Sequence, residues 1–339
     1  MRATVMRDRA LVVADVPVPT PGPGEVLVQT LACGICGSDL HALKHADRFA
    51  ASYRRPDGTP IMDLSRDIVM GHEFCAEIVD HGPATTRRLR AGTRVCSMPV
   101  LLRPAGRQTI GYSNEHPGGY GEYMRLSEEL LLEVPNGLST AHAALTEPMA
   151  VGLHAVNKAR LQAGESAYVV GCGPVGLAII AALRLHGVRP VVAADYSPRR
   201  RELAVIMGAD VVLDPAREED PERWRTATVI FECVGVPGVI AHIMEAAPRG
   251  ARIVVVGVCM EPDTIHPLRG ISKELALQFV LGYEADEFST TLTHIAEGKT
   301  PVAPLVTGTV PLTGVAQAFE ELASPERHAK ILVTPGERG

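Results

Sequence analysis

The chain has 339 residues, 46% of them hydrophobic and 21% charged, and its 33 basic and 39 acidic residues give a formal net charge of −6. This length is too great for one ordinary core and predicts two domains. The basic runs at 87–90 and 199–201 are short, so nucleic acid is not an expected partner. We find neither a secretory leader pattern nor an apolar run long enough to cross a membrane, and we expect a cytoplasmic protein.

Short β-type runs dominate residues 1–148, which are rich in Pro and Gly. These runs are at 11–16, 24–32, 73–82, 92–100 and 121–126, and turn signals separate them. The pattern predicts a β-rich, partly barrel-like domain.

From 149 to 285 the sequence pattern changes to short apolar strands, each followed by a helical stretch. The strands are expected at 167–171, 190–195, 229–235 and 251–257. This alternation predicts βαβ units and a doubly wound parallel sheet that is covered on both faces. Residues 286–339 have a mixed texture, with helices expected at 290–297 and 314–323 and a closing strand at 330–335.

The first of these strands runs into the sequence G-C-G-P-V-G at 171–176. Gly171, Gly173 and Gly176 have the spacing of a dinucleotide-binding turn: the first permits the tight turn, the second lets a pyrophosphate approach, and the third lets helix and strand pack. The helix begins at Pro174 and Val175, where free N–H groups can face the phosphate. Glycine-rich turns are common, but here a strand precedes the turn and a helix follows it.

Asp195 ends the second strand, nineteen residues past Gly176. A carboxylate there can accept hydrogen bonds from the adenosine ribose and repel a 2′-phosphate, which favours NAD over NADP. Alternatively, Asp195 is a turn or cap residue. Arg199 and Arg200 could tolerate a phosphate, but Asp195 comes first in the loop, so we expect NAD, with Arg200 among the binding residues.

A possible metal site involves three separated motifs. Cys36 lies in CGICGSDLH (33–41), His72 in GHEF (71–74) and Glu147 in TEPMAVG (146–152). The 7 cysteines do not form a secreted disulfide framework, and no second C-x-x-C completes a four-thiolate site. One thiolate, one imidazole and one carboxylate form a three-ligand set with an open position, which is typical of catalytic zinc.

Each of these residues alone has a more ordinary interpretation. Cys36 could be a small core residue and His72 a hydrogen-bonded strand residue, while Glu147 before Pro148 could begin a helix. It is their order ahead of the nucleotide turn that favours the metal site. A Lewis-acid metal beside a hydride carrier favours the interconversion of alcohols and carbonyls.

Seven motifs carry a resemblance that covers essentially the whole chain: GEVLV, CGICGSDLH, GHEF, GGYGEY, EPMAVGLHAV, VVGCGPVGLAII and HAKILV. With them the chain resembles the zinc-dependent medium-chain dehydrogenase/reductase superfamily, in its alcohol, sorbitol and threonine dehydrogenase branch. The resemblance implies a GroES-like catalytic domain built from 1–148 and 286–339, with a Rossmann NAD-binding domain at 149–285. It also implies a zinc-dependent NAD(H) oxidoreductase that interconverts a secondary alcohol or polyol and its ketone, as a homodimer or homotetramer.

The resemblance also assigns metal-site roles to individual residues. Cys36 and His72 match the zinc ligands, and Glu147 matches the acidic third ligand of the polyol-type branch. Glu73 matches a carboxylate beside the metal that can exchange with water as a ligand. Asp39 matches the group that orients the zinc histidine.

Other roles concern the substrate and the cofactor. Ser38 matches the hydroxyl that bonds the substrate alcohol and takes its proton, and His41 matches the outer end of the proton relay. Val234 and Val256 lie at the ends of two of the expected strands and should be near the nicotinamide ring.

Two features depart from the pattern of the resemblance. Many relatives bind a second, structural zinc with four closely spaced cysteines, whereas here Cys96 stands alone and the next cysteine is Cys172. The lobe at 97–117 therefore cannot hold such a site, and we predict one zinc per chain. The charged segment at 42–66 is long, and is either a solvated loop or a flap over the substrate entrance.

Two other functions remain as alternatives. The first is a zinc-independent quinone or enoyl reductase of the same fold, and the joint presence of Cys36, His72, Ser38 and His41 counts against it. The second is a non-catalytic NAD-binding protein, which is disfavoured because an intact relay serves no binding purpose.

Overall fold

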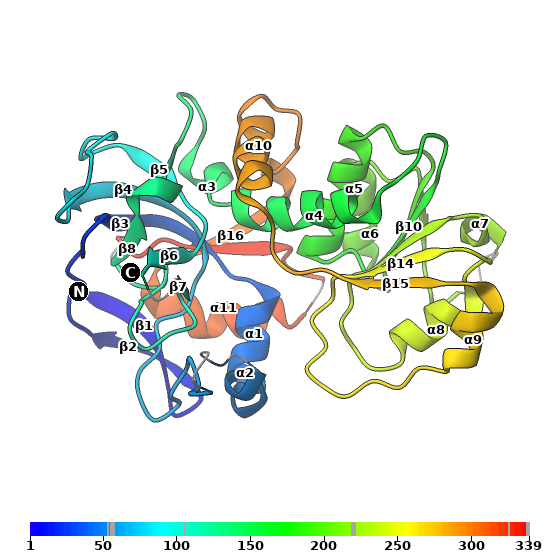
Figure 1. Cartoon of the computed structure of the whole chain (residues 1–339), viewed down its shortest axis with the longest axis horizontal. Helices are drawn as coiled ribbons and strands as arrows, with labels where there is room; N and C mark the ends of the chain where they lie inside the picture. Colours follow the sequence, from blue (N-terminus) through cyan, green and yellow to red (C-terminus); the bar gives the residue numbers. More distant parts are fainter. Residues whose placement is uncertain (53, 55–57, 105, 218–221, 325, 337–339) are drawn as a thin grey trace. The chain divides into compact units, whose positions relative to one another are not determined.

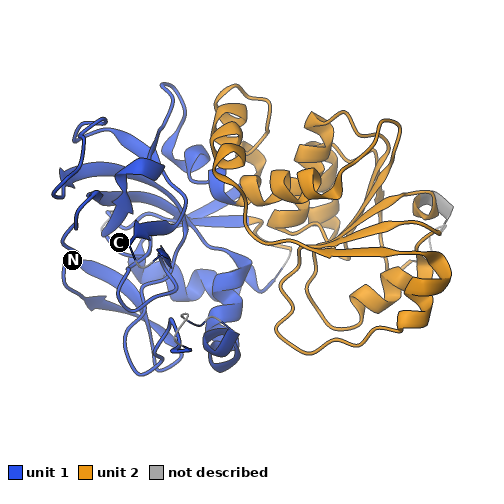
Figure 2. Cartoon of the chain, viewed as in Figure 1, with its two compact units in different colours: residues 1–147, 306–324, 330–339 blue, residues 148–305, 325–329 orange. Residues whose placement is uncertain are grey.

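The change of sequence pattern near residue 149 coincides with a division of the computed structural model into two compact units. Unit 1 comprises residues 1–147, 306–324 and 330–339, and unit 2 comprises 148–305 and 325–329 (Figure 2). The structure describes all residues except 53, 55–57, 105, 218–221, 325 and 337–339. No helix in this described part is long and apolar enough to span a membrane.

Unit 1 is built on a mostly antiparallel sheet of seven strands (Figure 1). Six of them are neighbours in the order β16-β17-β3-β4-β5-β9, and the seventh, β8, pairs with β3. Two hairpins, β1 with β2 and β6 with β7, accompany it. The strands are β1 Arg2–Arg7, β2 Ala10–Asp15, β3 Glu25–Gly34, β4 Glu73–His81, β5 Arg94–Cys96, β6 Val100–Arg103, β7 Gly106–Thr109, β8 Tyr123–Ser127, β9 Leu132–Glu133, β16 Val306–Val310 and β17 Lys330–Val333.

The helices of unit 1 are short and lie between these strands. They are α1 Gly37–Lys44, α2 Ala46–Ser52, α3 Thr140–Ala143 and α11 Val315–Leu322, with 3-10 turns η1 Glu128–Leu130 and η3 Leu312–Gly314. Strands β16 and β17 come from the end of the chain, and β17 pairs with β3, so both ends of the sequence contribute to this unit.

Unit 2 contains a six-stranded parallel sheet in the order β12-β11-β10-β13-β14-β15. Its inner strands are apolar and buried, as both-face coverage by helices requires. The strands are β10 Ala167–Val170, β11 Val191–Ala194, β12 Val211–Leu213, β13 Val229–Glu232, β14 Arg252–Val255 and β15 Ala276–Phe279. The predicted β-rich domain and doubly wound parallel sheet are thus confirmed.

Helices alternate with these strands. They are α4 Thr146–Ala159, which begins in unit 1, α5 Pro174–Leu185, α6 Pro198–Met207, α7 Glu222–Arg225, α8 Val239–Ala246, α9 Pro267–Lys273 and α10 Ala285–Ala296, with the 3-10 turn η2 Ala303–Leu305.

The chain returns to unit 1 at Val306, later than the residue 286 expected from the sequence. Helix α10 stays with unit 2 because its buried Glu287 binds helix α4. Glu287 Oε2 lies 2.6 Å from His154 Nδ1, and Glu287 Oε1 accepts a hydrogen bond of 2.7 Å from Asn157. A buried carboxylate needs such partners, and they lie on a helix of unit 2.

Candidate metal and cofactor sites

The pairing of β3 with β4 builds the candidate metal site. In this register Gly34 is opposite Glu73, so the turn after β3 lies beside the start of β4. Cys36 caps the N-terminus of α1, and His72 directly precedes β4. The ligand atoms of Cys36, His72 and Glu73 all lie within 4.8 Å of one another. One sulfur, one nitrogen and one oxygen donor suit zinc, so these residues fit the ion.

Asp39 is the buried centre of this region. Its Oδ2 accepts hydrogen bonds from the Cys36 backbone N–H at 3.1 Å and from the Tyr120 hydroxyl at 2.6 Å, and its Oδ1 accepts one from Tyr112 at 2.7 Å. His72 Nδ1 lies 3.5 Å from Oδ1. Burial raises the pKa of the Asp39 carboxyl, but His72 and the two tyrosine hydroxyls outweigh it and the pKa is lowered. Asp39 is therefore ionised, and His72 Nδ1 faces it.

A buried lysine neutralises Glu73. Lys330 Nζ donates to both carboxylate oxygens of Glu73 at 2.7 Å and to the Ile35 carbonyl at 3.0 Å. The side chains of Lys330 and Glu73 are 2% and 0% exposed. Burial acts to lower the pKa of Lys330, but the charges of Glu73 and Cys36 outweigh it, so the pKa is raised and the ammonium stays charged. The pair as a whole adds no net charge to the site.

Sequence reasoning did not identify Lys330. The signal was present in the motif HAKILV, where a lysine begins a strand that is otherwise apolar and is buried throughout. A lysine in such a strand is rarely buried without a charged partner. The identity of that partner depends on the sheet, which the local sequence does not specify.

Glu147, the third ligand expected from the sequence, is the second residue of α4 and is buried. Among the described residues, the group that could hold a metal contains Glu73 together with Cys36 and His72. Glu73 begins β4, directly after His72. Glu147 is nevertheless close enough for its charge to help raise the pKa of Lys330.

The two residues expected to act on the substrate proton lie on helix α1. The Ser38 hydroxyl lies 2.8 Å from the Tyr112 hydroxyl. His41 is partly buried, and its ring centroid is 6.2 Å from that of His45. Burial, followed by the charges of His45 and Lys44, lowers the pKa of His41, so it is neutral at pH 7 and can accept a proton.

The segment at 42–66 is partly helical. It continues from α1 into α2, whose Phe49 is buried and packs against Tyr112 with ring centroids 4.9 Å apart. Residues 53 and 55–57 of this segment lie outside the described part. The idea of a flap therefore stays a prediction.

The glycine turn at 171–176 connects β10 to α5. Gly171 has a φ of +93°, and a Cβ there would lie 2.8 Å from Val234 Cγ2. A Cβ on Gly176 would lie 1.9 Å from the Gly171 carbonyl oxygen, so the turn tolerates no side chain at either position. Gly173 caps α5 ahead of Pro174, and a Cβ there would meet no atom within 4 Å. This open space at a helix start fits a phosphate group.

Asp195 follows β11 and reaches the same turn. Its Oδ2 accepts a hydrogen bond of 2.8 Å from the backbone N–H of Cys172. Arg200 Nη1 lies 3.8 Å from that oxygen, whereas Arg199 pairs with Glu202 at 3.0 Å. Asp195 and Arg200 thus lie together at the carboxyl ends of β10 and β11, the edge at which doubly wound sheets bind nucleotides.

The remaining cofactor candidates lie at this edge too. Val175 is in the first turn of α5, Val234 is the second residue after β13, and Val256 directly follows β14. Glu232, which sequence reasoning missed, is buried beneath them, and its Oε1 accepts hydrogen bonds from the N–H groups of Val234 at 2.7 Å and Gly235 at 2.8 Å. Its backbone carbonyl accepts a bond from Val256 at 2.9 Å. Glu232 therefore fixes the loops on which the two valines lie.

Comparisons with known proteins agree with both sites. Residues 22–136 match the model of the alcohol dehydrogenase GroES-like domain, and residues 174–297 match that of the zinc-binding dehydrogenases. The chain is 32% identical over 332 residues to (R,R)-butanediol dehydrogenase of Bacillus subtilis, covering 94% of each protein. It is 28% identical over 324 residues to sorbitol dehydrogenase of Bos taurus, covering 90% of this chain and 87% of the relative.

A solved structure agrees over the whole length. The crystal structure of 2R,3R-butanediol dehydrogenase from Bacillus subtilis superimposes with a TM-score of 0.84 and 31% identity over 99% of both chains. The chain belongs to the zinc-dependent medium-chain dehydrogenase/reductase family. It is an NAD(P)-dependent alcohol dehydrogenase, an enzyme that interconverts an alcohol and a carbonyl compound by hydride transfer. The predicted family and enzyme class are confirmed, with zinc and NAD(P) as the cofactors of the class.

Replacement of Lys330 by Met should destabilise the metal-free protein. The substitution leaves Glu73 as a buried, uncompensated carboxylate, and breaking such a pair costs about 3–5 kcal/mol. Urea unfolding followed by circular dichroism would measure this loss, and Lys330→Met combined with Glu73→Gln should recover part of it.

Arg249→Met provides a matched control, because it breaks the exposed pair of Arg249 with Glu274, whose side chains are 70% and 67% exposed. Its cost should be below about 1 kcal/mol. Equal losses for the buried and exposed pairs would show that Lys330 does not compensate Glu73.

Proposed function

We propose that this enzyme oxidises secondary alcohols or vicinal diols to ketones, with NAD and one zinc ion per chain. The observation that carries the proposal is the cluster of Cys36, which is partly exposed, with the buried His72 and Glu73, in which Lys330 neutralises Glu73. A site rich in carboxylates can accommodate a second hydroxyl on the substrate. The two curated relatives described above, named for a diol and a polyol, support the same substrate class.

For the metal we propose Cys36, His72 and Glu147 as ligands, with Glu73 held beside them by Lys330 as a carboxylate that can replace a departing ligand. Cys36 and Glu147 supply two negative charges, which balance the charge of Zn²⁺. Because Lys330 balances Glu73, the metal keeps its ability to acidify an alcohol. The excess negative charge of an uncompensated Glu73 would weaken that ability.

When bound, zinc supplies a Lewis acid for the alcohol oxygen, and the nicotinamide supplies the hydride acceptor. Ser38 accepts the proton of the alcohol at its Oγ and at the same time gives up its own hydroxyl hydrogen to the relay that ends at His41. His41, which is neutral at pH 7, is the outer proton acceptor, from which the proton passes to solvent. Asp39 holds His72 in one orientation, as residues behind metal ligands commonly do.

Steady-state assays with NAD⁺ would test the function. The enzyme should oxidise 2,3-butanediol, sorbitol or 2-butanol with a higher kcat/KM than ethanol. A chelator should abolish turnover, and zinc should restore it. Elemental analysis should give about one zinc per chain, as one open three-ligand site requires. A clear preference for ethanol would contradict the substrate class, and two tightly held zinc ions would contradict the stoichiometry.

We propose NAD as the preferred cofactor because Asp195 lies at the glycine turn. Asp195→Ala should weaken discrimination against NADP⁺ by about 1–3 kcal/mol, since a hydrogen bond to a charged group is lost. The ratio of kcat/KM for NAD⁺ and NADP⁺ measures this effect. Glu202→Ala removes an exposed carboxylate from the same region and should leave the ratio unchanged. If the parent enzyme already prefers NADP⁺, Arg200 governs the pocket instead.

We propose that the protein is a homo-oligomer that associates through β15 of unit 2. Strand β15 is an edge strand of the six-stranded sheet. Its last residue, Phe279, is 68% exposed, and Leu281, two residues further along the chain, is 79% exposed. An edge strand with exposed apolar side chains is a site for pairing with another chain.

The substitution Leu281→Asp should yield monomers in light scattering, whereas Val205→Asp, on helix α6, should not. A monomeric parent would contradict the proposal. A cytoplasmic location stays a prediction from the sequence.

A further inference from the structure

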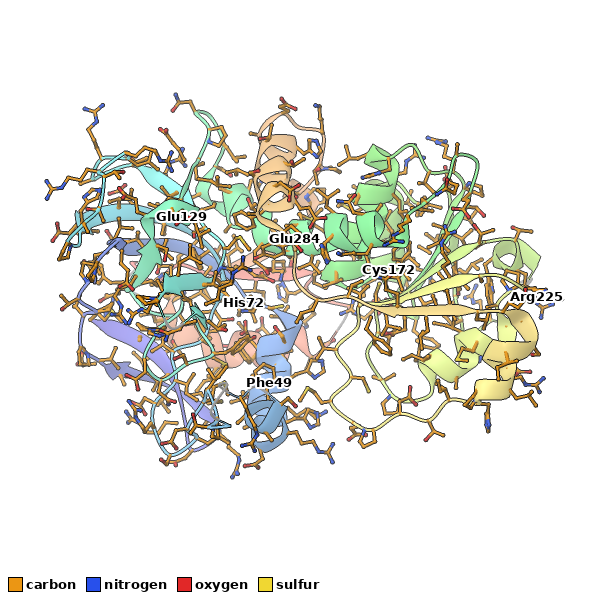
Figure 3. All side chains as sticks on the ribbon, viewed as in Figure 1. Phe49, His72, Glu129, Cys172, Arg225 and Glu284 are labelled. Atoms are coloured by element: carbon orange, nitrogen blue, oxygen red, sulfur yellow. The ribbon has the colours of Figure 1, made fainter. Side chains whose placement is uncertain are left out.

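Helix α1 carries a second pair of possible metal ligands, His41 and His45, outside the cluster around His72. The two residues are four positions apart, a spacing that puts both side chains on one face of a helix. The His45 N–H donates to the His41 carbonyl at 2.8 Å, and the Phe49 N–H donates to the His45 carbonyl at 2.9 Å. Phe49, which Figure 3 labels, is buried and anchors this stretch of backbone. The two imidazoles thus start from fixed positions.

The rings of His41 and His45 are close together and not engaged elsewhere. Their centroids are 6.2 Å apart with an angle of 28° between the planes, and both side chains are partly exposed. Within the described part of the chain, neither ring has a hydrogen-bond or ion-pair partner. The χ2 torsion of a histidine has broad preferences, so each ring can turn toward the other at little cost. One nitrogen of each ring can then reach the same ion.

The surroundings determine which ions this pair can hold. Burial, followed by the charges of His45 and Lys44, lowers the pKa of His41, so its ring is neutral at pH 7 and keeps a lone pair for a metal. The next carboxylate along the chain, Asp47, is paired with Arg9 at 2.8 Å. Mg²⁺ and Ca²⁺ need oxygen ligands, which the pair does not supply. Two imidazole nitrogens on one helical face suit Zn²⁺, Ni²⁺ and Cu²⁺.

An ion bound here acts on catalysis through His41, the outer proton acceptor of the proposed relay. A neutral imidazole has one unprotonated nitrogen, and a metal bound to that nitrogen leaves no lone pair for the proton. The pair lies toward the end of α1 that His45 caps, whereas Cys36 caps the other end. Two neutral donors bind an ion more weakly than a set that contains a thiolate and a carboxylate. The second ion therefore adds to the catalytic zinc and does not replace it.

We propose that His41 and His45 form an inhibitory site for a second transition-metal ion, which blocks the release of the alcohol proton through His41. The inhibitory effect rests on the proposed function, in which His41 accepts that proton. The binding of the ion does not depend on it, because the donor pair exists whatever reaction the enzyme catalyses.

Binding can be tested with Cu²⁺–iminodiacetate, a chelate that leaves coordination positions for two imidazoles. Added to the zinc-loaded enzyme, it should bind at one equivalent per chain, and its electron paramagnetic resonance spectrum should show two histidine nitrogens. His45→Ala should weaken binding about tenfold or more, since one of the two protein ligands is lost. His242→Ala is the matched control, because His242 is an exposed histidine on helix α8 with no histidine four positions away. It should bind the probe as the parent does.

Inhibition can be measured as the rate of 2,3-butanediol oxidation with NAD⁺. The bound probe should lower kcat at least about tenfold in the parent and in His242→Ala, because transfer to a proton acceptor is lost. The kcat of His45→Ala, relative to its own value without copper, should fall by less than about twofold, since little probe is bound at the same concentration. Elemental analysis should find the zinc content unchanged throughout.

The outcomes separate the inference from the proposed function. If the parent gives no spectrum with two histidine nitrogens, or if His45→Ala binds the probe as tightly as the parent, the inference is overturned. Binding by both histidines with an undiminished kcat, or inhibition that accompanies loss of zinc, overturns the inhibitory role. If the parent does not oxidise alcohols even without copper, the proposed function fails, and the spectrum still decides whether the second metal site exists.

Discussion

The structure of the metal site depends on a single buried charge, the carboxylate of Asp39. An ionised group out of contact with water is costly unless hydrogen bonds and opposite charge compensate it. Here the donors come from three separate segments: the start of α1, the lobe that contains Tyr112, and the approach to β8 that contains Tyr120. The same interactions that make the burial of Asp39 tolerable therefore place these segments around His72.

The neighbouring carboxylate of Glu73 is compensated in a different way. Asp39 is surrounded by neutral donors and remains a local negative charge beside His72. Glu73 has a full positive charge on Lys330, 2.7 Å away, and the pair is neutral as a whole. Two acidic residues in one region are thus compensated differently, Asp39 by neutral donors and Glu73 by a lysine. The environment of a carboxylate determines its electrostatic effect more than its residue type does.

Much of the fold could be predicted because its signals are local. The turn at 171–176 and the strands around it are recognisable from the spacing of glycines and from short apolar runs, which depend on neighbouring residues alone. Cys36 and His72 were recognisable from short motifs. Lys330 and Tyr112 were not, because their partners are 257 and 73 positions away in the sequence and only the register of the sheet and the path of the lobe bring them together.

The lobe at 97–117 is connected to the sheet by ionic contacts. Arg103 binds Glu25 at 2.6 Å, Arg125 donates to His116 Nδ1 at 3.0 Å, and His116 contacts Gln108 at 2.7 Å. Burial and the charges of Arg125 and Arg103 lower the pKa of His116 to about 4, so it stays neutral in this network at physiological pH. None of these three contacts uses a thiol or a metal ion, so they hold the lobe to the sheet without either.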